Sequence, residues 1–120
     1  WWLWGQVALV ALVSFCAYLG LLPALPALAG LDKALHTLLF GGLALPAVGW
    51  WGRARAAPVL AGLALLAAAE EALQALSPAR AFDPLDLAAS VAGLLAFGCL
   101  ARAMLLRRAA RGQFPPRHPA

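Results

Sequence analysis

Charged residues are scarce in this sequence. Only 12% of its 120 residues are Asp, Glu, Lys or Arg, whereas 64% are hydrophobic, and the mean hydropathy is +0.84. A soluble domain of this length needs far more polar surface to cover its core. The low charge therefore excludes a soluble globular protein and indicates that lipid surrounds most of the chain.

Cysteine and histidine are also rare, with two of each. Cys16 and Cys99 fall at different depths of the first and last apolar segments, so no disulfide is expected between them. His36 is the one histidine within the apolar part of the chain. Carboxylates would have to supply the other ligands of any metal, so the sequence predicts neither a metal site nor a cofactor.

Four apolar segments are long enough to cross a membrane. A transmembrane helix needs about 20 residues, because the hydrocarbon layer is about 30 Å thick and a helix rises about 1.5 Å per residue. The segments are residues 1–22, residues 31–51, a third that has Pro58 in its first turn and ends near residue 76, and residues 84–106. The sequence therefore predicts an all-α fold, a four-helix transmembrane bundle that forms one domain over residues 1–106.

The sequence DPLD at residues 83–86 marks the start of the fourth predicted helix. Asp83 suits the N-cap, Pro84 suits the first helical position, and Asp86 stands three residues after the cap. Residues 107–120, which follow this helix, are basic and rich in proline. They are predicted to form a disordered cytoplasmic tail.

The arginines predict how the bundle is oriented. Two of them, at positions 53 and 55, lie between the second and third segments. The others lie near the end of the fourth segment or after it, at positions 102, 107, 108, 111 and 117. Basic residues collect on the cytoplasmic side of a membrane. Both termini are therefore expected in the cytoplasm, with the basic tail on anionic lipid. Because the arginines flank apolar segments, the net charge of +4 does not predict a nucleic-acid partner.

The other ionisable side chains gather at the opposite, outer ends of the segments. We call the following residues the polar cluster: Asp32, Lys33, His36, Glu70, Glu71, Gln74, Arg80, Asp83, Asp86 and Ser90. A charge at the bilayer centre costs about 2.5 to 3.5 kcal/mol, so charges near the membrane need partners or a wet cavity. We therefore expect the second, third and fourth helices to aim these groups at one polar pocket that opens outward.

Three stretches, DKALHTLLF, EALQ and PARAFDPLDLAASVAG, occur in this order over residues 32–93. Together they resemble the VanZ-like family of small bacterial integral membrane proteins. The family's motifs correspond to Asp32, Lys33 and His36, then to Glu71 and Gln74, and then to Arg80 and Asp86. Ser90 departs from the pattern, because the family usually has Asn there. The resemblance implies a multi-pass protein of the bacterial cytoplasmic (inner) membrane, similar to cell-envelope proteins linked to glycopeptide resistance, a form of antibiotic resistance.

Three functions are compatible with these features. The first, implied by the resemblance, is recognition of a lipid-linked or cell-surface ligand. The second is that of a non-catalytic accessory subunit that docks its lipid-facing surfaces onto a larger membrane complex. The third is an enzyme acting on a lipid-linked substrate, with His36 and Glu71 as proton-transfer candidates; it ranks last because no nucleophile, metal or substrate loop is recognisable. His36 can equally be an interfacial residue satisfied by Asp32.

Overall fold

A computed structural model of the chain describes residues 1–21, 30–78 and 81–112. Within these ranges the chain forms four α-helices, one short 3-10 helix and no strand. The helices are α1 (Trp2–Tyr18), α2 (Leu31–Trp51), the 3-10 helix η1 (Arg53–Arg55), α3 (Ala56–Gln74) and α4 (Pro84–Ala110). The prediction of an all-α fold is confirmed.

The helices are those of a membrane protein. The stretches Leu31–Trp51, Arg53–Gln74 and Pro84–Ala110 are long and apolar enough to cross a membrane, and Trp2–Tyr18 is a shorter apolar helix. Large apolar side chains cover the outside of the bundle; Leu12 is 60% exposed and Leu65 is 73% exposed. In water such a surface would be an extended hydrophobic patch, whereas in a bilayer it contacts lipid.

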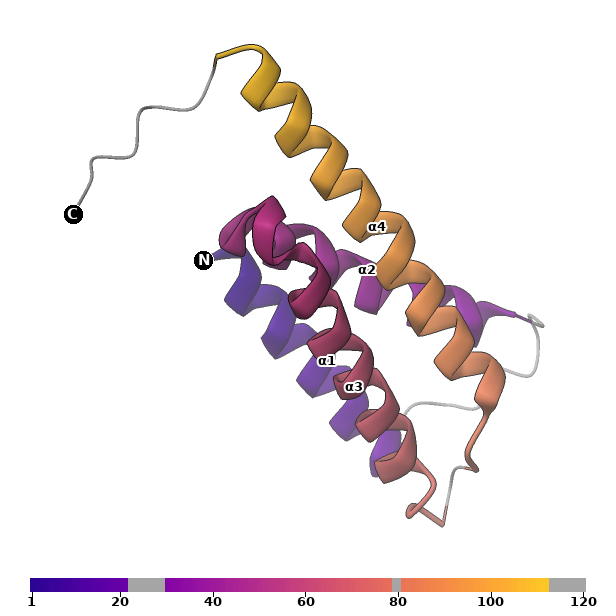
Figure 1. The fold of residues 1–120 in the computed structure, drawn as a ribbon. Coiled ribbons are helices and arrows are strands. Elements are labelled where there is room, and N and C mark those ends of the chain that lie inside the picture. The colour runs from indigo at the N-terminus through magenta and orange to yellow at the C-terminus, as the bar shows by residue number, and fades with distance from the viewer. Residues whose placement is uncertain (22–29, 79–80, 113–120) are drawn as a thin grey trace.

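Neighbouring helices along the chain run in opposite directions. Figure 1 shows the start of α1 beside the connection between α2 and α3 at one end of the bundle. The starts of α2 and α4 lie toward the other end, together with the ends of α1 and α3 (Figure 1). The last turns of α4 extend beyond the other three helices (Figure 1).

α1 ends earlier than the predicted boundary at residue 22. Gly20 follows the helix with a φ of +68°, a left-handed conformation that glycine adopts without steric cost. Its N–H donates to Ala17 O, and the N–H of Leu21 donates to Cys16 O. These are the two bonds of a Schellman motif, which terminates a helix by satisfying its last carbonyls.

α4 begins where the sequence predicts. The Asp83 side chain accepts from the Leu85 N–H, and Pro84 occupies the first helical position. The Asp83 N–H donates to Glu71 Oε1 at 2.7 Å, so a carboxylate of α3, rather than that of Asp86 three residues after the cap, completes this helix start. α4 also continues past the predicted end at residue 106, because residues 107–110 are arginines and alanines, which favour helix. The rest of the predicted tail, residues 113–120, lies outside the described residues.

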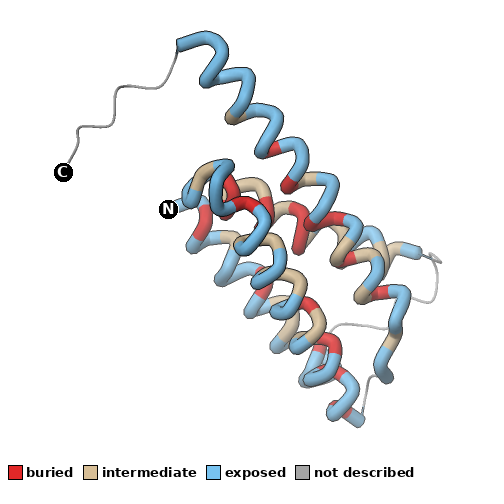
Figure 2. The backbone as a smooth tube through the Cα atoms, viewed as in Figure 1, coloured by how far each residue is buried: buried red, intermediate tan, exposed pale blue. Residues whose placement is uncertain are grey.

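The tightest helix contact joins α2 to α4. A Cβ atom on Gly93 would lie 2.2 Å from Thr37 O, and one on Gly41 would lie 2.7 Å from a ring carbon of Phe97. Glycine at these two positions therefore lets the helices approach closely, as small residues do in membrane bundles. The buried residues follow the faces that the helices turn to one another, with the outer surface exposed (Figure 2). This contact fixes how the first turns of α2 and α4 meet.

Candidate functional site

The first turns of α2 and α4 and the last turns of α3 bring most of the polar cluster together. The members that the structure describes are Asp32, Lys33 and His36 on α2, Glu70, Glu71 and Gln74 on α3, and Asp83, Asp86 and Ser90 at the start of α4. Arg80 lies outside the described residues. The cluster therefore combines three segments that are distant in the sequence.

Lys33 forms ion pairs with three carboxylates. Its ammonium Nζ lies 3.0 Å from Asp32 Oδ2, 3.1 Å from Asp83 Oδ2 and 3.0 Å from Asp86 Oδ1. The Asp86 side chain is 8% exposed, whereas that of Asp32 is 49% exposed. Since an ion pair in low dielectric is screened less than one in water, the bond to Asp86 is the strongest of the three.

His36 bridges α2 and α4. Its Nδ1 is 3.1 Å from Ser90 Oγ, which is a hydrogen bond in either direction, and its Nε2 is 3.7 Å from Asp86 Oδ2. The expected partner Asp32, one helical turn away, instead binds Lys33. The interpretation of His36 as a residue satisfied by Asp32 is therefore wrong: its partners come from the neighbouring helix.

Glu70, which is half-buried, and Glu71, which is buried, are the two carboxylates of α3. Glu71 is 1% exposed, and its Oε1 accepts the Asp83 N–H. The Gln74 amide donates to Glu70 Oε1. The Oε2 atoms of both glutamates are buried, and neither has a hydrogen-bond partner among the described residues. A buried carboxylate oxygen without a donor is costly, so these two atoms mark the least satisfied point of the cluster.

Asp83 sits at the surface of the cluster, just before α4. The Leu85 N–H and the Lys33 ammonium both bind its carboxylate and hold the pKa of Asp83 below its ordinary value. Hydrogen bonds to the ionised form have this effect. Asp83 is therefore ionised at neutral pH, where it both caps α4 and pairs with Lys33.

Two hydroxyl groups that the sequence reasoning did not single out also hold this end together. Thr37 Oγ1 lies 2.9 Å from Lys33 O and 3.1 Å from Ala89 O, so its one proton is shared between α2 and α4. Ser77 Oγ donates to Tyr18 O at 2.7 Å and ties the end of α1 to the end of α3. A hydroxyl four residues after a helical carbonyl is a recognisable pattern, but the contacts across helices need the fold.

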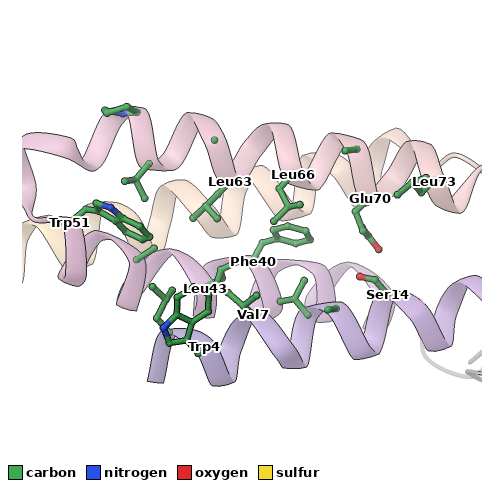
Figure 3. A pocket seen from close by; sticks show the side chains of 18 residues that line it. Trp4, Val7, Ser14, Phe40, Leu43, Trp51, Leu63, Leu66, Glu70 and Leu73 are labelled. Carbon is green, nitrogen blue, oxygen red and sulfur yellow. The ribbon is translucent and has the colours of Figure 1, made fainter. Parts of the chain in front are cut away.

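An apolar cavity of about 540 Å³ lies between α1, α2 and α3. Its lining comes mostly from leucine, valine, alanine and aromatic side chains. Figure 3 shows Trp4 and Trp51 toward one end, and Glu70 and Ser14 toward the other, with their oxygens directed into the space between α1 and α3. The cavity is apolar almost throughout, and Glu70, a member of the polar cluster, and Ser14 supply polar atoms at one end of it.

Two groups of side chains in the cluster have donor atoms close enough to share a cation. The donor atoms of His36, Glu70 and Glu71 lie within 4.8 Å of one another, as do those of Asp32, Asp83 and Asp86. The Lys33 ammonium already occupies the second group. The first group has no cationic side chain at its centre among the described residues.

The described part of the cluster has five carboxylates against one lysine and one histidine. Such a site accepts hydrogen bonds and binds cations more readily than anions. One hydroxyl of the cluster, Ser90 Oγ, lies beside a possible base, His36 Nδ1, at 3.1 Å. In comparisons with known proteins, no family model, no curated protein and no solved structure matches this chain.

Proposed function

We propose that this chain is a VanZ-like protein of the bacterial cytoplasmic membrane that binds an amphiphilic, lipid-linked ligand of the cell envelope. In this proposal all four helices cross the membrane, both termini are cytoplasmic, and the polar cluster lies at the outer surface. The arginines around η1 and in the second half of α4 support that orientation, because basic residues collect on the cytoplasmic side. The same arginines would hold the inner end on anionic lipid.

The position of Glu70 is the observation that carries the proposal. Glu70 lines the apolar cavity between α1, α2 and α3, and it also bonds to Gln74 in the polar cluster. One continuous site can therefore take an apolar chain along the cavity and a polar headgroup at its end. The cavity volume of about 540 Å³ is in the usual range of ligand pockets.

The charge of the cluster selects the kind of headgroup. Carboxylates accept hydrogen bonds and repel anions, so the site favours hydroxyl, amide or ammonium donors. Sugars and peptides on a lipid carrier present such donors. A lipid-linked sugar or peptide of the envelope is therefore the ligand class that fits both halves of the site, and it agrees with the family's link to glycopeptide resistance.

The test is to fill the cavity without touching the polar cluster. Gly62 lines the cavity, and an added Cβ there meets no atom within 4 Å, so Gly62→Phe should place a ring in the cavity. Gly49→Phe is the matched control, because Gly49 is exposed, has the same free space and does not line the cavity. The wild-type protein, extracted in mild detergent, should carry a lipid-linked species in native mass spectra. Gly62→Phe should lose it, and Gly49→Phe should keep it.

Other outcomes decide against the proposal. A wild-type protein that carries no lipid-linked species, or a Gly62→Phe variant that carries as much as wild type, would overturn it. A stoichiometric partner protein in all three preparations, without bound lipid, would instead support the accessory-subunit function. For the link to resistance, expression in a sensitive bacterial host should lower susceptibility to glycopeptides, and Gly62→Phe should abolish the effect.

A further inference from the structure

We infer that His36, Glu70 and Glu71 form a binding site for one divalent transition-metal cation. This goes beyond ligand recognition, because the site would exist whether or not a lipid-linked ligand binds. It also departs from the sequence-based expectation of no metal site. That expectation rested on the scarcity of histidine. The sequence alone does not show that α2 and α3 bring these side chains together.

The geometry brings three donors from two helices to one point. One donor atom from each of His36, Glu70 and Glu71 lies within 4.8 Å of the others. Ligands held at about 2.1 Å from a Zn²⁺ ion in tetrahedral geometry lie about 3.4 Å apart. The glutamate side chains have enough rotatable bonds to close the remaining distance without movement of the helices.

The unpartnered carboxylate oxygens of the two glutamates point to a cation as their partner. Glu71 is 1% exposed, and the Oε2 atoms of Glu70 and Glu71 are buried without a partner among the described residues. Two adjacent carboxylates repel each other when both are ionised, and the buried Glu71 has also lost its hydration. Lys33 does not relieve them, since its ammonium binds the three aspartates. A divalent cation would satisfy both Oε2 atoms at once.

Each of the three side chains is also held by a second contact, as metal ligands usually are. Glu71 Oε1 accepts the Asp83 N–H, and Glu70 Oε1 accepts the Gln74 amide. His36 Nδ1 is bonded to Ser90 Oγ, which leaves Nε2 available, with Asp86 Oδ2 3.7 Å away and beyond hydrogen-bonding distance. These contacts orient the donors before any ion arrives.

The donor set selects the class of ion. One imidazole nitrogen and two carboxylate oxygens suit Zn²⁺, Mn²⁺ or Fe²⁺, whereas Ca²⁺ and Mg²⁺ prefer oxygen alone and Cu⁺ prefers sulfur. Three protein ligands leave at least one position for water or for an oxygen of a bound molecule. Zn²⁺, which needs no reducing conditions, is the most convenient probe.

The test measures Zn²⁺ uptake by untagged protein in detergent, after treatment with a chelator. A His118→Ala background makes His36 the only histidine in the chain. Calorimetry should show one Zn²⁺ per chain, and Glu71→Gln or His36→Ala should weaken binding by at least about 100-fold, because loss of a residue that only orients a ligand already costs up to about 100-fold. Asp32→Asn is the matched control, because it removes a carboxylate from the group that Lys33 occupies, and its affinity should equal that of the parent.

A second measurement does not depend on the variants folding. X-ray absorption at the zinc edge of the parent protein should show one imidazole and carboxylate oxygens in the first shell, without sulfur. No stoichiometric uptake by the parent, a sulfur ligand, or unchanged affinity in a folded Glu71→Gln variant would each overturn the inference. Because this test uses Zn²⁺ alone and the cavity test uses bound lipid, failure of one leaves the other standing.

Discussion

The residue on which charge balance in the polar cluster depends is Lys33. It bonds to Asp32, Asp83 and Asp86, and the Asp86 side chain is 8% exposed. If the lysine is removed, the ion-pairing contact that remains for Asp86 among the described residues is His36 Nε2, 3.7 Å from Asp86 Oδ2. Removing one partner of a buried pair leaves the other charge uncompensated, which is more harmful than removing both.

Replacing Lys33 by methionine should therefore lower the thermal unfolding temperature clearly, and Asp32→Asn should change it little because Asp32 is half exposed. The double variant Lys33→Met, Asp86→Asn should recover part of the loss, since neither charge then remains buried alone. Circular dichroism in one detergent, with equal helix content before heating, measures all three. Equal unfolding temperatures for Lys33→Met and Asp32→Asn would contradict this account.

The pairing of side chains within the polar cluster could not be predicted from the sequence. The apolar segments and the grouping of the acids at one end of the bundle follow from the order of residues alone, because lipid makes charge costly wherever it occurs. Partners do not follow, because spacing along one helix shows only shared faces. Asp32 and His36 share a helix face, yet they do not pair with each other. Asp32 pairs with Lys33, and His36 is hydrogen-bonded to Ser90. Contacts between α2 and α4 decided these pairs.

At the scale of helices, the close contact between α2 and α4, which we call the seam, requires glycine. The Gly93 position leaves no room for a methyl group, since its nearest atom is Thr37 O, a backbone atom that cannot move without the helix. Thr37 in turn spans the seam through its hydroxyl. The relative position of the Lys33 and Asp86 side chains depends on this close approach.

Gly93→Ala should push α2 and α4 apart and destabilise the bundle by about 1 to 3 kcal/mol, the usual cost of an overpacked core. Gly62→Ala is the control, because its Cβ would meet nothing within 4 Å, and it should leave stability unchanged or raise it slightly. Unfolding in mixed detergent and denaturing surfactant measures both. A Gly93→Ala variant as stable as Gly62→Ala would show that the seam is looser than described.

Helix boundaries were predictable where a cap or a proline marks them. α2 runs over the predicted residues, and α4 starts after Asp83 as expected. The end of α1 was missed because Gly20, rather than the following prolines, supplies the left-handed residue that closes the helix. The end of α4 was missed because arginine and alanine favour helix even where the chain leaves the apolar region.

At the scale of the whole molecule, the two ends of the bundle differ in charge. The arginines of η1 lie at one end and the polar cluster at the other, because α2 and α3 each run between the two ends. Basic residues are more numerous at the η1 end, which has Arg53, Arg55 and the arginines in the last turns of α4, than at the end with the polar cluster, and this predicts that the η1 end is cytoplasmic.

Single cysteines should reveal this orientation in intact cells. With Cys16 and Cys99 replaced by alanine, Ala81→Cys should react with a membrane-impermeant maleimide from outside, and Ala54→Cys should react only after lysis. Both positions are exposed, so access to the thiol does not differ for local reasons. Labelling of position 54 in intact cells, with position 81 protected, would place the polar cluster in the cytoplasm and contradict the proposed orientation.

The length of α4 has a consequence for the surrounding lipid. Its 27 residues span about 40 Å, whereas the hydrocarbon layer is about 30 Å thick. A helix of this length that crosses the layer must tilt or project from it. Its last turns carry Arg102, Arg107 and Arg108, so the projecting part would place positive charge among the lipid headgroups.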